Sequence, residues 1–299
     1  MNNPRRCLLF VPGTRPERFE KALATGADQV CIDLEDAVPL SEKVAAREAT
    51  FAFVAARNAV SLPAHSELGF RINAISTDLG KADLRAVVAA QLRPAFIMLP
   101  KVEDAGDIQV ALSILGAHHV PLIAQLESPR AVFEARSIAK AGKGANCLQA
   151  LMFGGFDYAV AARVKPGAAG WAWARGMIAA AAAEAEVGAI DVPSLEIKDA
   201  AVVESETMDV IELGFTGKSA IHPAQVDAIQ CAYLPTAAEV AQSEKIIAAI
   251  AAAAGTSSEG AIAVDGKLVD RPIELAATRI VELAKLGTRN ASPSLANVA

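Results

Sequence analysis

Residues 29–38, QVCIDLEDAV, have the pattern of a buried parallel strand that ends in a cluster of acids. The aliphatic residues of this stretch require an apolar interior, whereas Asp33, Glu35 and Asp36 crowd its C-terminal end. Carboxylates packed this closely repel one another and lose hydration. The stretch therefore predicts a strand of a core sheet, and it raises the question of which positive groups compensate the acids.

Seven other short apolar runs alternate with segments of helical periodicity. The eight runs are CLLFVPG (7–13), QVCIDLEDAV (29–38), LGFRINA (68–74), AFIMLPK (95–101), PLIAQLES (121–128), LQALMFGGFD (148–157), GAIDVPS (188–194) and GKSAIHP (217–223). Near-continuous apolar strands that alternate with helices indicate a parallel sheet buried on both faces. Eight such units in about 250 residues predict an α/β fold of the (β/α)8 TIM-barrel type. An open doubly wound sheet is the alternative, but nothing in the sequence marks a topological switch point.

The remaining residues predict a small C-terminal extension. We expect the barrel to occupy residues 1–254 of the 299 and the extension to occupy residues 255–299. The segment 255–272 has the pattern of a loop and a short hairpin, and the segment 273–287 has the pattern of a helix. This extension is expected to be lid-like and able to contact a neighbouring subunit.

Charge and hydropathy exclude several classes of partner. The formal net charge is −6 and no basic stripe is present, which argues against nucleic acid. The longest apolar stretches fall below the roughly 18 residues that a membrane span needs. The N-terminal apolar run is too short for a signal peptide. We therefore expect a cytoplasmic, enzyme-sized protein without a membrane or nucleic-acid partner.

Polar residues collect where the predicted strands end. In a barrel of this type the active site is built from the C-terminal ends of the strands. The residues at these ends are Pro12, Gly13, Asp33, Glu35, Asp36, Arg71, Asn73, Lys101, Glu127, Asp157, Asp191 and His222. Packing alone does not require a polar residue at nearly every strand end, so the pattern indicates a functional site.

Glu127 and Asp157 are the candidate metal ligands. Two acids that face one central cavity repel each other unless they are protonated or neutralised by a cation. Oxygen-only ligands suit Mg²⁺, which takes one or two carboxylates and leaves other positions to water and substrate. Gly154 and Gly155 precede Asp157 and allow the backbone to approach a ligand closely. The alternative is that each acid pairs with a neighbouring lysine or arginine.

Arg71 and Lys101 are the candidate cations of the site. The bidentate fork of Arg71 suits a substrate carboxylate. Its alternative role is a structural ion pair with Asp33, Glu35 or Asp36, and both roles can hold together. Lys101 could form a Schiff base or an ion pair, and we favour the ion pair because a metal and a Schiff base would be redundant.

Several of these stretches together resemble a known family. They are LLFVPGTRPERFEKALATGADQVCIDLEDAV (8–38), FRIN (70–73), LPKVE (99–103), FGGFD (153–157), AIDVPSLEIKD (189–199) and GFTGKSAIHPAQ (214–225). In this order they resemble the citrate lyase β-subunit-like proteins of the HpcH/HpaI aldolase superfamily. The resemblance implies a Mg²⁺-dependent (β/α)8 barrel that makes or breaks a carbon–carbon bond in a 3-hydroxyacyl thioester. Citryl-CoA, malyl-CoA and citramalyl-CoA lyases belong to this group, which forms trimers or hexamers.

The resemblance also implies roles for residues of the predicted site. Glu127 and Asp157 become the Mg²⁺ ligands, and Glu127 also lies against the substrate. Arg71 binds the carboxylate or oxyanion of the α-keto acid half. Glu35 and Asp36 hold the water molecules of the metal and orient Arg71. A divalent cation and an arginine would thus compensate the crowded acids.

Three further residues take roles from the resemblance alone. Arg15 and Lys21 lie where family members meet the phosphates of coenzyme A. Asp270, in DGKLVDRP (265–272), matches an aspartate that acts as acid or base in the site of a neighbouring subunit. A surface turn is the alternative role for Asp270. Trp171 and Trp173 follow Asp157 in the sequence and could form a wall of the acyl pocket.

The implied reaction is a retro-Claisen cleavage that yields an acyl-CoA, or an acyl-carrier thioester, and an α-keto acid. One rival function is that of a class II pyruvate-type aldolase of the same superfamily, but those enzymes use an early histidine and this chain has none before His65. A second rival function belongs to a different class of protein, a non-catalytic scaffold that binds CoA thioesters.

Overall fold

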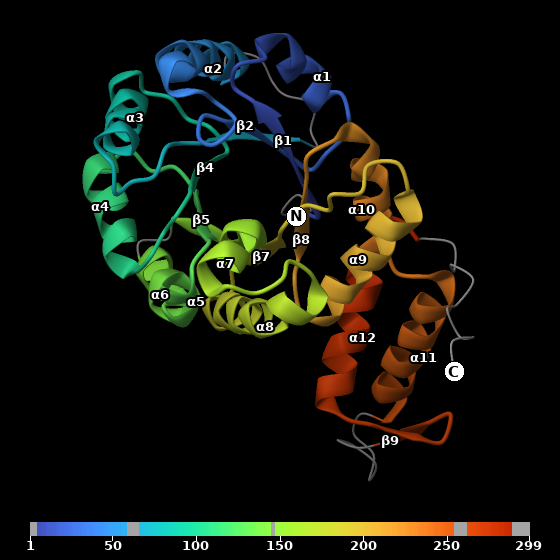
Figure 1. Ribbon diagram of the computed structural model, residues 1–299. Helices are drawn as coiled ribbons and strands as arrows, with labels where there is room; N and C mark the ends of the chain where they lie inside the picture. The colour runs from blue at the N-terminus through green and yellow to red at the C-terminus, as the bar shows by residue number, and fades with distance from the viewer. Residues whose placement is uncertain (1–4, 59–65, 145–146, 254–261, 289–299) are drawn as a thin grey trace. The chain divides into compact units, whose positions relative to one another are not determined.

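Eight parallel strands form a closed barrel in which every strand pairs with its neighbours in chain order, and helices surround the strands (Figure 1). The barrel closes where β1 pairs with β8, with Leu8 opposite Ser219. The structure is a computed structural model and describes residues 5–58, 66–144, 147–253 and 262–288. The predicted (β/α)8 barrel is confirmed.

The strands and helices have the following bounds. The barrel strands are β1 (Cys7–Pro12), β2 (Gln29–Asp33), β3 (Glu67–Arg71), β4 (Phe96–Leu99), β5 (Leu122–Leu126), β6 (Leu148–Phe153), β7 (Gly188–Asp191) and β8 (Gly217–Ala220). The helices up to β8 are α1 (Phe19–Leu23), α2 (Lys43–Asn58), α3 (Asp78–Ala89), α4 (Ala105–Leu115), α5 (Pro129–Phe133), α6 (Ala135–Gly144), α7 (Gly155–Ala162), α8 (Ala168–Ala185) and α9 (Ala200–Glu212). After β8 follow α10 (Val226–Ala232), α11 (Ala237–Ala253), β9 (Ile262–Val264), β10 (Lys267–Val269) and α12 (Arg271–Ala284).

Side chains from most of the strands fill the interior of the barrel. The central cluster consists of Leu8, Cys31, Phe96, Met98, Ile123, Ala150, Met152 and Ile190. Gly69 on β3 makes room for the ring of Phe96, because a Cβ on Gly69 would lie 2.6 Å from that ring. The interior of the barrel is therefore a packed core, and the polar groups lie at the C-terminal ends of the strands.

A buried ionic group ties β7, β8 and α8 together. Asp191 is fully buried and accepts hydrogen bonds from Arg175 Nε and Nη2, both at 2.9 Å. Lys218 Nζ donates to Asp191 at 2.8 Å and to the carbonyl oxygen of Val192 at 2.9 Å. Asp191 is one of the acids that the sequence places at a strand end. Its side chain serves this internal contact.

By its contacts the chain divides into two compact units, residues 1–229 and 230–299. The second unit contains a hairpin of β9 and β10 and the helix α12, as the sequence predicts. Asp265 and Gly266 have positive φ values of 50° and 76° at the hairpin turn, the conformation that an Asp-Gly turn adopts. The sequence predicts a boundary after residue 254, but α11 packs against α12 and so belongs to the second unit.

The helix α7 is not apparent in the sequence. It is short, and apolar residues occupy most of its positions, so its periodicity carries no clear amphipathic signal. Asp157 consequently lies in the first turn of a helix and does not extend directly from the strand end. Among the helices that the structure describes, none has the length and hydropathy needed to span a bilayer.

Replacing Asp191 should test the buried ionic group. Asp191→Ala leaves two buried cations without their counter-charge. Removal of one partner of a buried ion pair lowers the free energy of unfolding by about 3–5 kcal/mol. The exposed N-cap Asp199 of α9 provides the control, because Asp199→Ala removes a cap and should cost about 1 kcal/mol. Urea unfolding of the two variants measures both losses. Equal losses would contradict the structural role of Asp191.

Candidate functional site

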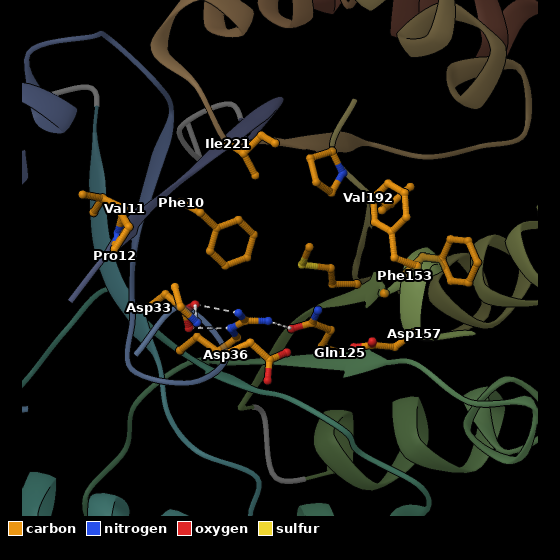
Figure 2. Close-up of a pocket in the computed structure, with 16 residues that line it drawn as sticks. Phe10, Val11, Pro12, Asp33, Asp36, Gln125, Phe153, Asp157, Val192 and Ile221 are labelled. Carbon is orange, nitrogen blue, oxygen red and sulfur yellow. Dashed lines mark hydrogen bonds and ion pairs between the residues drawn. The ribbon is translucent and has the colours of Figure 1, made fainter. Parts of the chain in front are cut away.

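A cavity of about 400 Å³ lies at the C-terminal ends of the barrel strands (Figure 2). One wall is polar and the other is apolar, so a ligand that fits it has one charged and one apolar part. The polar lining residues are Asp33, Asp36, Arg71, Gln125 and Asp157, and the other lining residues are Phe10, Val11, Pro12, Ala37, Met152, Phe153, Gly154, Phe156, Val192, Pro193 and Ile221.

Arg71 ends β3 and lies beside Asp33, its partner in the register of β2 and β3. Arg71 Nε and Nη2 donate to the two carboxylate oxygens of Asp33 at 2.8 and 2.7 Å. Nη1 lies 3.4 Å from Glu35 Oε2. Burial by itself lowers the pKa of Arg71, but the hydrogen bonds and charges of Asp33 and Glu35 outweigh it and raise that pKa. Arg71 is therefore a permanently charged group in a fixed orientation.

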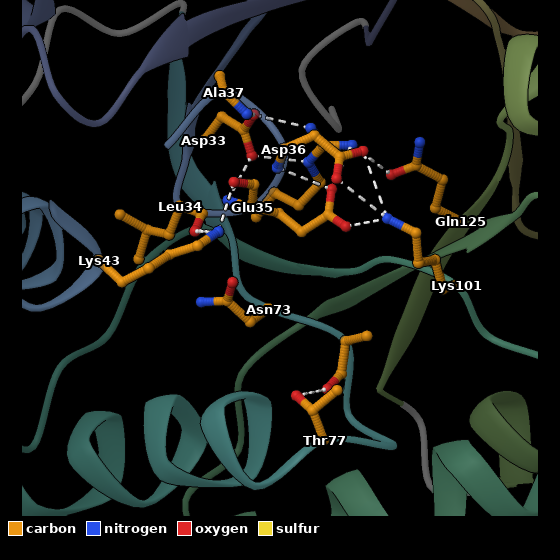
Figure 3. A network of polar contacts seen from close by, with 12 residues as sticks. Asp33, Leu34, Glu35, Asp36, Ala37, Lys43, Asn73, Thr77, Lys101 and Gln125 are labelled. Atoms are coloured by element: carbon orange, nitrogen blue, oxygen red, sulfur yellow. Dashed lines mark hydrogen bonds and ion pairs between the residues drawn. The ribbon is translucent and has the colours of Figure 1, made fainter. Parts of the chain in front are cut away.

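The predicted ion pair of Arg71 is thus present, and it changes which N–H groups of the guanidinium are available to a substrate. The bidentate edge of the guanidinium faces Asp33, so a substrate carboxylate can meet only the remaining N–H groups. Asp33 also accepts from the backbone N–H groups of Glu35 and Ala37, at 2.9 and 3.1 Å (Figure 3). Asp33 therefore orients both Arg71 and the acidic loop.

Lys101 compensates the two other acids of this loop. Its ammonium group contacts Glu35 Oε1 and lies 3.2 Å from Asp36 Oδ1 (Figure 3). Burial lowers the pKa of Lys101, but the hydrogen bond and charge of Glu35 outweigh this effect and raise the pKa. The ion pair that the sequence favours for Lys101 is confirmed. Lys101 has a positive φ of 53°, which is uncommon for a residue with a side chain.

Glu35 and Asp36 differ in how readily they hold a proton. Burial, the largest effect, raises the pKa of Glu35, although Arg71 and Lys101 oppose it. Burial also acts to raise the pKa of Asp36, but hydrogen bonds with Glu35 and Lys101 outweigh it and lower that pKa. Lys43 adds a third cation, because its Nζ donates to the carbonyl oxygens of Leu34 and Glu35 at 2.9 and 2.5 Å.

Glu127 is a buried carboxylate without a hydrogen-bond partner. It is 4% exposed, and neither of its carboxylate oxygens has a partner among the described residues. Burial, followed by the charge of Asp157, raises the pKa of Glu127 to about 8. A Cβ on Gly154 would lie 2.4 Å from Glu127 Cγ, so the glycine at this position makes room for the carboxylate. Buried acceptors in this state require a cation or a proton.

Mg²⁺ fits this donor set. Among the residues that the structure describes, no group of three or more His, Cys, Asp or Glu side chains is placed to hold a metal. Two carboxylates, Glu127 and Asp157, are what Mg²⁺ commonly takes from a protein, with water and substrate in the other positions. When all are ionised, five acids of the site carry five negative charges: Asp33, Glu35, Asp36, Glu127 and Asp157. Arg71, Lys101 and Lys43 carry three positive charges, so one divalent cation balances the difference of two.

The remaining predicted residues lie outside this group of contacts. Arg15 and Lys21 are exposed after β1 and on α1, and neither forms an ion pair with a residue in the described ranges. Asp270 is the N-cap of α12, where its side chain accepts from the Ile273 N–H at 3.4 Å. The proposed contacts of these three residues with coenzyme A and with a neighbouring site stay predictions.

The aromatic wall differs from the one that the sequence suggests. Phe153 and Phe156 line the cavity, whereas Trp171 packs behind them with ring centroids 5.9 and 5.4 Å away. Trp173 is exposed and packs against Phe133, with the two rings tilted by 58°. Sequence reasoning also misses Gln125 as a lining residue. Its position on β5, two residues after the interior residue Ile123 and at the C-terminal end of the strand, is the signal that could have found it.

Comparison with known proteins gives consistent matches over most of the chain. The profile of the family described as HpcH/HpaI aldolase/citrate lyase matches residues 6–223. Citrate lyase subunit beta of Leuconostoc mesenteroides subsp. cremoris is 34% identical, and the alignment covers 95% of each chain. A (3S)-malyl-CoA thioesterase of Cereibacter sphaeroides is 29% identical over 90% of each chain. The structure of CitE from Mycobacterium tuberculosis in complex with magnesium, acetoacetate and coenzyme A is 30% identical with a TM-score of 0.76, over 95% of this chain and 98% of that chain.

Replacing Glu127 should change how stability depends on pH. Because the pKa of Glu127 is raised from 4.5 to about 8, the folded protein binds a proton that the unfolded chain releases, and the metal-free protein loses stability as pH rises through this window. Glu127→Gln removes this loss. At pH 8 without metal, the free energy of unfolding of the variant should therefore exceed that of the wild type by on the order of 3 kcal/mol. Urea unfolding at pH 5 and pH 8 measures the difference. Parallel pH profiles would contradict the assignment.

Adding a side chain at Gly154 should displace Glu127. We expect Gly154→Ala to cost about 1–3 kcal/mol through overpacking and to weaken Mg²⁺ binding at least about tenfold. Gly176 on α8 is the matched control, because a Cβ there meets no atom within 4 Å and alanine should stabilise the helix by roughly 0.5–1 kcal/mol. Titration with Mg²⁺ and urea unfolding measure both effects. Unchanged Mg²⁺ affinity in Gly154→Ala would show that Glu127 does not bind the metal.

Proposed function

Because the chain belongs to the HpcH/HpaI aldolase/citrate lyase family, we propose that it is a Mg²⁺-dependent carbon–carbon lyase. Its substrate is a 3-hydroxyacyl thioester, which it cleaves into an acyl-CoA and an α-keto acid, or forms from them. The observation that carries this proposal is the buried Glu127 carboxylate, which lacks a partner among the described residues and lies near Asp157 and a fixed arginine. The related CitE complex with magnesium, acetoacetate and coenzyme A supports it.

The polar wall binds the keto-acid half of the substrate. Glu127 and Asp157 hold the Mg²⁺ ion, which supplies Lewis-acid polarisation of the substrate oxygens. Arg71 faces the substrate with the N–H groups that Asp33 leaves free, and it stabilises negative charge on an oxygen. Asp33 and Glu35 hold the guanidinium in place, so little reorganisation is needed during the reaction.

The remaining residues take part in proton transfer and thioester binding. Asp36 lines the cavity, where its carboxylate can accept the proton of the substrate hydroxyl. Its neighbour Glu35 is held by Lys101 and Arg71. Asp270 acts from a neighbouring subunit of a trimer or hexamer, and Arg15 and Lys21 meet the phosphates of coenzyme A.

The proposed cleavage balances as a retro-Claisen reaction. Removal of the hydroxyl proton converts the hydroxyl-bearing carbon to the keto carbon as the adjacent carbon–carbon bond breaks. The electron pair of that bond passes to the α-carbon of the thioester as an enolate. Asp270 then donates a proton to this carbon. The apolar wall of the cavity, with Phe10, Met152 and Phe156, accommodates the acyl part.

Thioester hydrolysis is a second candidate function, favoured by the similarity to (3S)-malyl-CoA thioesterase. It would use the same thioester but break the bond between acyl carbon and sulfur. The products then are free coenzyme A and a hydroxy acid, whereas the lyase gives an acyl-CoA and an α-keto acid. A non-catalytic scaffold would give no product from any thioester, and a class II aldolase would need no thioester.

Mg²⁺ with an α-keto acid should stabilise the wild-type protein against heat. A ligand at one hundred times its Kd contributes about 2.7 kcal/mol to the folded state, and EDTA should reverse the shift in Tm. Asp157→Asn should abolish the shift and the turnover of malyl-CoA or citramalyl-CoA without lowering the metal-free Tm, because Asp157 is exposed and its charge disfavours the ionised Glu127. The exposed Asp78 on α3 is the control, and Asp78→Asn should behave like the wild type.

Chromatography of the products distinguishes the candidate activities. Full activity in Asp157→Asn would refute the metal assignment, and the absence of both shift and products in the wild type would favour the scaffold. Release of free coenzyme A with a hydroxy acid would identify the thioesterase.

A further inference from the structure

Gln125 presents an open hydrogen-bond donor on the floor of the cavity. It lies on β5, lines the cavity and is only 5% exposed. Its side-chain Oε1 accepts from Arg71 Nη1 at 3.3 Å. Its Nε2 makes no hydrogen bond with any residue in the described parts of the chain.

The neighbouring arginine determines the orientation of this amide. A guanidinium group only donates hydrogen bonds, so the oxygen of Gln125 must face Arg71 and the nitrogen must point away from it. Figure 2 shows this arrangement, with the amide oxygen of Gln125 toward the guanidinium and the nitrogen on the other side. The open donor is therefore a consequence of the Arg71 contact and not of an arbitrary amide orientation.

An open donor beside Arg71 favours an acceptor from a ligand. Gln125 lines the cavity, so an acceptor oxygen that enters the cavity can form a hydrogen bond with its Nε2. The positive charge of Arg71 favours an acceptor that carries negative charge. Because Asp33 occupies the bidentate edge of Arg71, the guanidinium alone offers a carboxylate fewer donors than an unpaired arginine would.

We propose that Gln125 is a substrate-binding residue whose Nε2 donates to a carboxylate oxygen of the α-keto acid half, next to Arg71. This inference rests on the proposed lyase function and adds a residue to its substrate site. Residues two apart on a strand face the same side, so Gln125 points into the barrel as Ile123 of the central cluster does, and Asp157 lines the same cavity. The carboxylate therefore binds between the Arg71–Gln125 donors and the metal ligands.

Two substitutions separate recognition of the substrate from support of Arg71. Gln125→Glu keeps an oxygen for Arg71 Nη1 but replaces the donor with a second acceptor of like charge to the substrate. Gln125→Met removes both functions at similar volume. If Gln125 lay away from the carboxylate of the ligand, Gln125→Glu would bind keto acids as the wild type does, because the new charge would not meet the ligand.

Isothermal titration of pyruvate and oxaloacetate in the presence of Mg²⁺ measures the effect, with Tm of the ligand-free proteins as the check on folding. We expect the Kd to rise about tenfold to a hundredfold in Gln125→Met, the range for loss of a hydrogen bond to a charged group. We expect a larger rise in Gln125→Glu, whose ligand-free Tm stays near that of the wild type because the Arg71 contact is kept.

The outcomes distinguish this inference from the function on which it rests. If the wild type binds keto acids and the Kd of Gln125→Glu stays within twofold of the wild-type value, the role of Gln125 is overturned but the proposed function is not. Absence of keto-acid binding in the wild type overturns both the role and the proposed function. A rise in Kd that is larger for Gln125→Glu than for Gln125→Met, without a matching fall in Tm, supports the inference.

Discussion

The need to compensate buried carboxylates with positive charge organises the C-terminal end of this barrel. Asp33 and Glu35 are almost fully buried, and each lies against a cation that another strand or its following loop provides. Carboxylates in this setting are stable only when paired and hydrogen-bonded. The oxygens of the buried Glu127 have no partner among the described residues, and burial and the charge of Asp157 raise its pKa. The proposed Mg²⁺ site follows from this imbalance of charge.

The same contacts give the site its rigidity. Asp33 holds Arg71 through two hydrogen bonds and also binds the backbone of the acidic loop, so the cation and the loop are oriented together. Gly154 leaves the space that Glu127 occupies, and Lys101 reaches the acids from a backbone conformation with positive φ. A site that binds charge through fixed dipoles and charges needs little rearrangement when the charge on the substrate changes.

The two walls of the cavity divide the substrate into two parts. The polar wall carries the arginine, the acids and Gln125, and it suits the keto-acid half with its oxygens. The opposite wall consists of aromatic and aliphatic side chains, and it suits an acyl chain that carries no charge. The buried contacts of Asp191 with Arg175 and Lys218 support this apolar side, because Lys218 also holds the backbone at Val192.

The sequence by itself determined the barrel, the strand ends that carry the polar groups, and the identities of Arg71, Glu127 and Asp157 as candidate site residues. These features are local, because apolar periodicity and the place of a residue at a strand end can be read along the chain. Only the tertiary structure decided which groups meet. Asp33 holds the fork of Arg71, Gln125 turns an open donor toward the cavity, and the division into units falls after Ile229. Such pairings join residues far apart in the sequence, and their geometry depends on strand register and packing, which a one-dimensional pattern does not contain.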